Sequence, residues 1–355
     1  MILPLNFPKF FIYDIFFNGT EYVIITSKIT SQTISLQHST KILFNYISPK
    51  SLNCYIKKKS NKFRNKHPQL LYSCSHEIYT LNINDHNIAF TPYIHLIINQ
   101  QSNNISHLIT PVNIYPNYTN KIIMSTLVLN ENNYIIPWIE YYRMLGVNAF
   151  IIYDNKNDNN NENKNEKSLE TLLSPYIKLN IVTLIKWDYT YTNQAQDTQQ
   201  NHSIWAFRSS SYIGLFDVDE YLNLQDINNS LHDFFSLYLS VFPNQIDNIG
   251  CFKFYSKNFV NINNQSEKHL DFLSIYNCGP IITNGRAKSF VIPRNVSLYS
   301  IHIIVIGMPT ITLNIYFNHY IFLNKYNRGR TKIPHMHTDN SIYPLHKKLI
   351  DRWFS

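Results

Sequence analysis

Charged residues are scarce in this chain of 355 residues. Asp, Glu, Lys and Arg make up only 15% of it, whereas soluble domains usually contain about a quarter. The hydrophobic fraction is nevertheless 44%, and 15% of all residues are aromatic. A chain with this much apolar material can bury a core, so the composition excludes an intrinsically disordered protein.

Cysteines are also few. The four present cannot form a disulfide framework in a chain of this length, and no C-x-x-C pattern indicates a zinc site. Cys54 and Cys74 lie near each other in the sequence, as do Cys251 and Cys278. Two disulfides would need an oxidising compartment, so the composition leaves the state of these cysteines open.

Long apolar runs and a signal peptide are missing as well. No stretch approaches the roughly 18 consecutive apolar residues that a transmembrane helix needs. The segment from Met1 to Lys9 is apolar but contains two prolines and no preceding basic region, so it makes a poor signal peptide. We therefore expect no transmembrane segment and, by default, a cytoplasmic protein, with membrane association left open.

Positive charge exceeds negative charge, because 31 Lys and Arg stand against 23 Asp and Glu, which gives a net charge of +8. Such a balance favours anionic ligands such as nucleotides and phosphates. The only dense basic run extends from Lys57 to Lys66. No nucleic-acid-binding motif accompanies it, so we interpret it as a solvated loop and expect no nucleic-acid partner.

The chain changes character near residue 121. Before it, short β-branched and aromatic runs alternate with turn residues such as Asn18-Gly19, which predicts strands. After it, apolar runs alternate with stretches of helical periodicity, a pattern typical of a Rossmann-like α/β domain with a mostly parallel sheet and helices on both faces. We predict a β-rich N-terminal module at 1–120, an α/β domain at 121–333 and a C-terminal tail at 334–355.

The α/β region begins with a complete β-α-β unit. The runs Ile122 to Leu129 and Val147 to Tyr153 predict buried parallel strands. Apolar residues recur at helical spacing between them, with a proline in the first turn and a glycine at the expected C-cap. The helical residues are Ile135, Trp138, Ile139, Tyr142 and Leu145, with Pro137 and Gly146. We expect Trp138 and Tyr142 to face the core.

Polar side chains follow three of the predicted strands. They are Asn130 and Glu131, Asp154 and Asn155, and the pair Asp217 and Asp219 after the run Tyr212 to Phe216. Ligands of parallel α/β sheets bind at the carboxyl ends of the strands. We therefore expect these side chains, together with Lys288, to line one cleft.

The segment Asp217-Val218-Asp219-Glu220 is the most informative of these clusters. Burying unpaired carboxylates at the end of a strand costs several kcal/mol, so they need cations or hydrogen-bond donors as partners. A hard divalent metal ion with oxygen ligands is one natural partner. The simpler interpretation is a solvated strand end or a helix N-cap, and the position within the strand–helix series favours a functional site.

The residues of this region, taken in order, resemble glycosyltransferase family 92, whose members carry a D-x-D pair. The match begins with Leu129-Asn130-Glu131, the segment Trp138 to Val147 and the pair Tyr153-Asp154. It continues with Tyr176 to Trp187, Gln194, Phe216 to Leu222, Lys288 to Pro293, His302, and Asn318-His319-Tyr320 with Lys325, Arg328 and Gly329. The series covers roughly residues 125–330 and is specific as a set.

The chain departs from the family pattern in three places. Asn180 replaces the glycine before Val182, and the segment Phe252 to Lys257 lacks the glycine that the family often has. The membrane anchor of most animal and plant members is not visible. The missing glycine affects the prediction for the acceptor side of the site. The missing anchor affects the prediction of a Golgi location.

The resemblance implies a type-A glycosyltransferase fold with its catalytic domain at 121–333. It implies a hexosyltransferase that moves a hexose, with galactose favoured, from a nucleotide sugar such as a UDP-hexose to a glycan or glycoconjugate acceptor, with inversion. It also implies a divalent cofactor, Mn²⁺ or Mg²⁺. The alternative is a catalytically inactive carbohydrate-binding or assembly protein of the same fold, although the intact carboxylates argue against it.

Site roles also follow from the resemblance. Asp219 is expected to bind the metal directly, and Asp217 to share the metal or the ribose hydroxyls. Lys288 would hold phosphate as a point charge. Glu220 is the nearest candidate for the general base of an inverting transfer, with a structural partner of the site as the alternative. The donor-binding set is Asn130, Glu131, Asp154, Asn155, Gln194 and Lys288.

A histidine is expected to complete the metal site, because imidazole is an acceptable ligand for manganese. His319 is preferred, since its polar neighbours suit the phosphate side of a site. His302 lies in the apolar run Ile301 to Ile306 and is the alternative ligand or a core residue.

Overall fold

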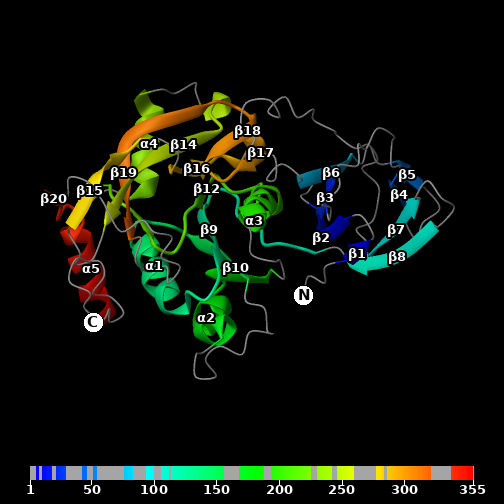
Figure 1. Cartoon of the computed structure of the whole chain (residues 1–355), viewed down its shortest axis with the longest axis horizontal. Coiled ribbons are helices and arrows are strands. Elements are labelled where there is room, and N and C mark those ends of the chain that lie inside the picture. Colours follow the sequence, from blue (N-terminus) through cyan, green and yellow to red (C-terminus); the bar gives the residue numbers. More distant parts are fainter. Residues whose placement is uncertain are drawn as a thin grey trace. The chain divides into compact units, whose positions relative to one another are not determined.

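A computed structural model of the protein describes residues 5–7, 10–17, 21–28, 42–45, 51–53, 76–82, 93–99, 105–111, 113–155, 168–187, 193–224, 230–241, 246–259, 277–283, 286–320 and 337–354. The chain divides into two compact units (Figure 1). One comprises residues 1–117 and 189–208, and the other comprises 118–188 and 209–355. Cys54, Cys74 and the basic run Lys57 to Lys66 lie outside the described residues.

The first unit contains two antiparallel four-stranded sheets. One has the order β1 (Leu5–Phe7), β2 (Phe10–Phe17), β3 (Glu21–Lys28) and β6 (His76–Asn82). The other has the order β5 (Ser51–Asn53), β4 (Ile42–Asn45), β7 (Tyr93–Asn99) and β8 (Ile105–Pro111).

Helix α3 (Asn193–Ala206) belongs to this first unit and packs on β3. It is held to β2 by a buried polar contact, in which His202 Nε2 hydrogen-bonds Asp14 Oδ2. The same carboxylate accepts hydrogen bonds from Asn113 and from the hydroxyl of Tyr115. These partners satisfy a carboxylate that would be costly to bury alone.

The second unit is built on one large sheet. Its order is β11 (Val182–Lys186), β10 (Ala149–Asp154), β9 (Ile122–Val128), β12 (Tyr212–Leu215), β16 (Lys288–Val291), β14 (Cys251–Phe259), β15 (Asn277–Ile282) and β20 (His337–Thr338). Strand β19 (Thr310–Tyr320) pairs with β14 and with β13 (Glu220–Leu222). A separate hairpin joins β17 (Val296–Ser300) and β18 (Ile303–Gly307).

The first four strands of this sheet, from β11 to β12, are parallel, as the alternating pattern predicted. The direction changes at β12, because β16 runs antiparallel to it. Leu215 pairs with Ser289 in this register, so the first residue of β16, Lys288, lies beside the carboxyl end of β12. The mixed sheet thus brings two distant parts of the sequence together at one edge.

Helix α1 (Asn132–Met144) covers part of this sheet, and its residues Trp138 and Tyr142 are fully buried, as expected. The prediction that Pro137 lies in the first turn was wrong. The helix begins at Asn132, so Pro137 lies inside it. Gly146 follows the helix with a φ of +92°, a left-handed conformation that glycine adopts without steric cost.

Helix α2 (Leu169–Lys178) is capped by Ser168, whose side chain accepts a hydrogen bond from the backbone N–H of Thr171. Asn180 follows with a φ of +55°. Asparagine tolerates this left-handed conformation better than most residues. The replacement of a family glycine by Asn180 is therefore compatible with the backbone at this position.

Helices α1, α2, α4 (Leu231–Val241) and α5 (Tyr343–Phe354) share one hydrophobic core. That core takes alternate residues of the parallel strands, such as Ile122 and Met124 of β9 and Phe150 and Ile152 of β10. Because alternate residues of a strand point to the same face, these four helices cover one face of the sheet. Two 3-10 turns, Ile246–Asn248 and Pro293–Asn295, complete the described elements.

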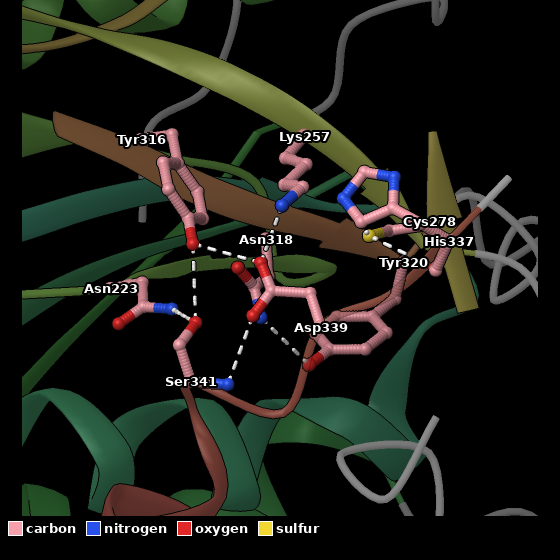
Figure 2. Close-up of polar contacts among 9 residues, drawn as sticks. All are labelled: Asn223, Lys257, Cys278, Tyr316, Asn318, Tyr320, His337, Asp339 and Ser341. Atoms are coloured by element: carbon pink, nitrogen blue, oxygen red, sulfur yellow. Dashed lines mark hydrogen bonds and ion pairs between the residues drawn. The ribbon is translucent and has the colours of Figure 1, made fainter. Parts of the chain in front are cut away.

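Helix α5 forms within the segment for which the sequence predicted a tail, and its Leu345 and Leu349 are buried in the shared core. The chain before α5 is fastened to β14 and β19 by polar contacts (Figure 2). Lys257 and Asp339 form an ion pair, and the hydroxyl of Tyr316 donates to Asp339 Oδ2 at 2.8 Å. Ser341 accepts a hydrogen bond from Asn223 Nδ2 at 2.8 Å.

The two cysteines within the described residues, Cys251 and Cys278, are buried free thiols. Cys278 lies in β15 beside His337 of β20 (Figure 2), with Sγ and Nε2 3.5 Å apart. No helix in the described ranges is long and apolar enough to cross a membrane.

Candidate functional site

The acidic segment forms a tight turn between β12 and β13. The backbone N–H of Glu220 donates to Asp217 O at 3.1 Å, and the N–H of Asp217 donates to Glu220 Oε2 at 2.9 Å. Phe216 and Val218 are each 1% exposed and point into the core. The turn therefore alternates buried apolar anchors with carboxylates, which fixes the directions of the acidic side chains.

Two tyrosine hydroxyls of helix α1 form hydrogen bonds with the backbone at the end of this turn and in β13. Tyr142 Oη donates to Glu220 O at 3.0 Å and accepts from the N–H of Leu222 at 3.1 Å. Tyr141 Oη donates to Leu222 O at 2.8 Å. A buried tyrosine hydroxyl needs a partner, and here that need positions the acidic segment.

Strand β19 brings His319 to the acidic turn. Glu220 pairs with His319 in the antiparallel register of β13 and β19. The backbone N–H of Tyr320 also donates to Asp219 O at 2.9 Å. The imidazole Nε2 of His319 consequently lies 3.4 Å from Asp219 Oδ2.

Asp219, Glu220 and His319 form a group that could hold a metal ion, since one ligand atom from each lies within 4.8 Å of the others. Ligand atoms about 2.0–2.3 Å from an ion lie up to about 4.5 Å apart across it, so the spacing fits. Asp219 Oδ1 and His319 Nδ1 are buried and have no hydrogen-bond partner among the described residues. Two orphaned polar atoms in one cluster indicate a ligand that would satisfy them.

The carboxylates raise the basicity of His319. Burial alone would lower its pKa, but Asp219 and Glu220 together raise it above its ordinary value. The arrangement therefore attracts positive charge, whether as a proton on the imidazole or as a metal ion. His319, the preferred histidine ligand of the sequence analysis, thus lies beside Asp219.

Lys288 makes the other strong contacts in the site. Its Nζ lies 2.7 Å from Asp217 Oδ2 and 3.1 Å from Glu220 Oε2, and the lysine side chain is only 3% exposed. Burial would lower the pKa of Lys288, but the two carboxylates raise it above its ordinary value. Its ammonium therefore stays charged, and it lowers the pKa of Asp217 against the opposing effect of burial.

Glu220 has little room for movement. Burial raises its pKa to about 8 against the opposing effect of Lys288, with Asp217 and Asp219 adding to the rise. Its side chain is 3% exposed, and Oε2 contacts both Lys288 and the backbone N–H of Asp217. A carboxyl group held in this way stabilises the turn more readily than it reaches an acceptor.

Glu131 belongs to the same acidic cluster. Burial raises the pKa of Glu131 well above its ordinary range, and repulsion from Asp219, Asp217 and Glu220 adds to the rise. The neighbouring Asn130 is exposed and has a φ of +57°. The end of β9 therefore contributes a further carboxyl group at the edge where β12 ends.

His302 lies in the turn of the β17–β18 hairpin, and its Nδ1 is 2.7 Å from Ala287 O. Because a carbonyl only accepts, Nδ1 carries the proton of the neutral ring. Burial and the charge of Lys288 lower the pKa of His302 to about 4. His302 is not a member of the metal-ligand group formed by Asp219, Glu220 and His319.

The remaining donor-binding residues lie in different surroundings. Asp154 ends β10 at the same sheet edge as Asp217, because β10, β9 and β12 are parallel. Asn155 is 2% exposed and donates from Nδ2 to Trp187 O at 2.7 Å, which ties the ends of β10 and β11. Gln194 lies in α3 of the other unit, and its side chain is outside the described residues, as are Lys325, Arg328 and Gly329.

The structure adds contacts to two of the predicted site residues. The ammonium of Lys288, which was expected to hold phosphate, lies between Asp217 and Glu220. Asp217 was expected to share the metal or the ribose hydroxyls, and it is outside the group formed by Asp219, Glu220 and His319. The sequence analysis overlooked the hydroxyls of Tyr141 and Tyr142, because helical spacing indicated only core packing.

The comparisons with known proteins agree with the resemblance seen in the motifs. The family model described as Glycosyltransferase family 92 matches residues 121–355. The match starts close to the beginning of the second compact unit and includes every residue of the acidic turn, β16 and β19. No curated protein matches the chain.

Proposed function

The chain belongs to glycosyltransferase family 92, and from this premise we propose that it transfers a hexose, with galactose favoured, from a nucleotide sugar to a glycan acceptor with inversion. We further propose that the reaction depends on Mn²⁺ or Mg²⁺. The observation that carries this proposal is the group formed by Asp219, Glu220 and His319, in which two buried polar atoms have no partner among the described residues.

Asp219 and His319 would hold the cation, with Glu220 beside them. When bound, such a cation neutralises the charge that develops on the leaving nucleoside diphosphate. Asp217 remains 39% exposed, so its carboxylate can accept hydrogen bonds from ribose hydroxyls. Asp154 at the neighbouring strand end is the proposed acceptor for the nucleoside.

The general base is a separate question. An inverting transfer needs a base that reaches the acceptor hydroxyl. Glu220 is 3% exposed and bonded to Lys288, which does not suit that task. We propose that Glu220 stabilises the turn and the cation instead, and that another group contacts the acceptor.

A donor screen tests the proposal. Hydrolysis and transfer should be measured for several nucleotide sugars with Mn²⁺, with Mg²⁺ and with chelator. We expect one UDP-hexose to be turned over only when the metal is present, and Asp219→Asn to abolish metal-dependent nucleotide binding while the protein stays folded.

Asp247→Asn is the matched control, because the side chain of Asp247 is 85% exposed and lies 3.7 Å from Arg294, away from the acidic turn in the sequence. It should behave like the wild type. Unchanged nucleotide affinity in Asp219→Asn would refute the metal assignment. Binding of a glycan without turnover of any donor would instead support an inactive binding protein of the same fold.

A further inference from the structure

Lys288 is placed by the sheet itself. It is the first residue of β16, and the antiparallel pairing of β16 with β12 sets it beside the acidic turn. On its other side β16 pairs with β14, where Lys288 is opposite Phe254. The backbone of Lys288 is therefore fixed by its own pairing with β14 and by the pairing of the next residue, Ser289, with Leu215 of β12.

The ammonium contacts two of the carboxylates and not the others. Its distances are 2.7 Å to Asp217 Oδ2 and 3.1 Å to Glu220 Oε2, whereas Asp219 faces His319 instead. A buried lysine is stable only when its charge is paired, so this contact persists in the folded protein. Lys288 therefore neutralises Asp217 and contacts Glu220, whereas Asp219 and Glu220 both belong to the candidate metal-ligand group.

A bound divalent cation would lie close to this ammonium. Glu220 belongs both to the metal-ligand group and to the Lys288 contact, so both positive charges would share one carboxylate. Like charges at such short range repel strongly, because water screens them little when they are buried. The diphosphate of a donor carries negative charge that offsets this repulsion.

We propose that Lys288 is a positioning residue that acts as a built-in counter-cation, holding Asp217 and Glu220 back and keeping the affinity for a divalent cation low until the donor diphosphate is present. This inference rests on the proposed function for the identity of the diphosphate. The role of Lys288 towards the cation itself depends only on the geometry of the acidic turn. Asp217 is then not a ligand of the cation in the donor-free protein.

The test is a calorimetric titration of the full chain with Mn²⁺ alone, in the absence of nucleotide and sugar. Lys288→Met keeps the length of the side chain but removes its charge, and so releases Asp217 and Glu220. We expect its affinity for Mn²⁺ to rise by about tenfold or more. Lys288→Arg keeps the charge and should show no such rise.

A purely structural role of Lys288 predicts the opposite result, namely weaker binding or none in Lys288→Met. That result would overturn the inference, as would equal Mn²⁺ affinity in the wild type, Lys288→Met and Lys288→Arg. Absence of Mn²⁺ binding in every variant, including folded Lys288→Met, would overturn it too.

A second variant keeps the inference testable if Lys288→Met fails to fold. Asp217→Asn changes a side chain that is 39% exposed and lies outside the metal-ligand group. It should therefore weaken donor-free Mn²⁺ binding far less than Asp219→Asn does. Asp219→Asn should abolish the same binding. If Asp217→Asn weakens Mn²⁺ binding as much as Asp219→Asn does, Asp217 is a direct ligand and the inference is wrong.

These titrations are independent of the donor screen. Failure of every nucleotide sugar would refute the proposed transferase, yet the Mn²⁺ affinities of the Lys288 variants would still decide the counter-cation role. Conversely, a successful transfer assay with unchanged Mn²⁺ affinities would refute only the role of Lys288.

Discussion

His319 and His302 illustrate how two histidines close to one acidic cluster can have opposite electrostatics. The pKa of His319 is raised by Asp219 and Glu220 despite burial, whereas burial and Lys288 lower the pKa of His302 to about 4. The first ring therefore binds positive charge, and the second stays neutral. Their different partners, Asp219 for His319 and the carbonyl of Ala287 for His302, account for the difference.

His319→Ala should reduce metal-dependent turnover by about tenfold or more, because changes around a bound metal cost at least that much. His302→Ala should reduce it less, since its ring contacts a backbone carbonyl. The free energy of unfolding should change little in His319→Ala. Turnover measured across a series of Mn²⁺ concentrations separates the two variants, and a larger loss in His302→Ala would reverse the assignment.

His302 should also make the free energy of unfolding decrease at acidic pH. Its pKa is lowered from 6.5 to about 4, so the unfolded chain takes up a proton between these values and the folded protein does not. Stability is then fully present above about pH 6.5 and is lost as the pH falls towards 4, by up to about 3 kcal/mol.

His302→Gln removes this titration. The loss of unfolding free energy between pH 6.5 and 4 should therefore be smaller in His302→Gln than in the wild type, as measured by denaturant titrations at several pH values. Parallel pH profiles for the two proteins would show that His302 is protonated as easily in the folded state as in the unfolded state.

At the scale of secondary structure, helix α1 supports the acidic turn through Tyr141 and Tyr142. Tyr142 makes two hydrogen bonds to β13, to Glu220 O and from Leu222 N–H, whereas Tyr141 makes one, to Leu222 O. All of these groups are buried. A lost partner therefore leaves a buried polar group unsatisfied, which costs about 1–3 kcal/mol.

Tyr142→Phe should consequently destabilise the protein more than Tyr141→Phe, although both changes remove only one oxygen atom. The expected losses are about 2–3 kcal/mol and about 1 kcal/mol. Chemical denaturation of the two variants gives the comparison. Equal losses would mean that the second hydrogen bond of Tyr142 contributes nothing to stability.

The elements near the site differ in how well the sequence predicts them. The strands ending near Asp154 and Asp217 could be predicted because a buried parallel strand is a local apolar run. Strand β13 could not be predicted, since Glu220–Leu222 is only three residues long and is too short to show the alternation of a strand. Its pairing with β19, which delivers His319, depends on long-range register, and the contact between Lys288 and Asp217 depends on the antiparallel β12–β16 pair.

At the scale of the whole molecule, the second compact unit extends to the end of α5, and the family match extends equally far. The attachment of this last segment depends on Asp339, which contacts Lys257, Tyr316 and the backbone N–H of Ser341 (Figure 2). Burial would raise the pKa of Asp339, but Lys257 and Ser341 hold it well below its ordinary value. The stabilisation by this carboxylate is thus present at neutral pH and is lost only in strong acid.

Asp339→Asn should loosen the C-terminal segment, because it leaves the ammonium of Lys257 without its counter-charge in a site where the two side chains are 9% and 11% exposed. A loss of about 2–4 kcal/mol is expected. The double variant Lys257→Met with Asp339→Asn should recover part of it, since no charge is then left unpaired. Denaturation and limited proteolysis of α5 measure both effects, and a double variant less stable than Asp339→Asn would contradict the explanation.

Strand β19 presents different chemistry on its two faces, with His319 opposite Glu220 and its neighbour Asn318 beside Tyr316 and Tyr320 in the region of Asp339 (Figure 2). In a deep mutational scan, substitutions at these two adjacent positions should therefore affect different properties, namely abundance at one position and activity at the other. Substitutions of the fully buried Asn318 should lower the abundance of the protein, whereas substitutions of His319 should leave abundance intact and remove activity. Selection would then act on neighbouring codons for unrelated reasons, so that this strand can lose its chemistry in evolution long before it loses its fold.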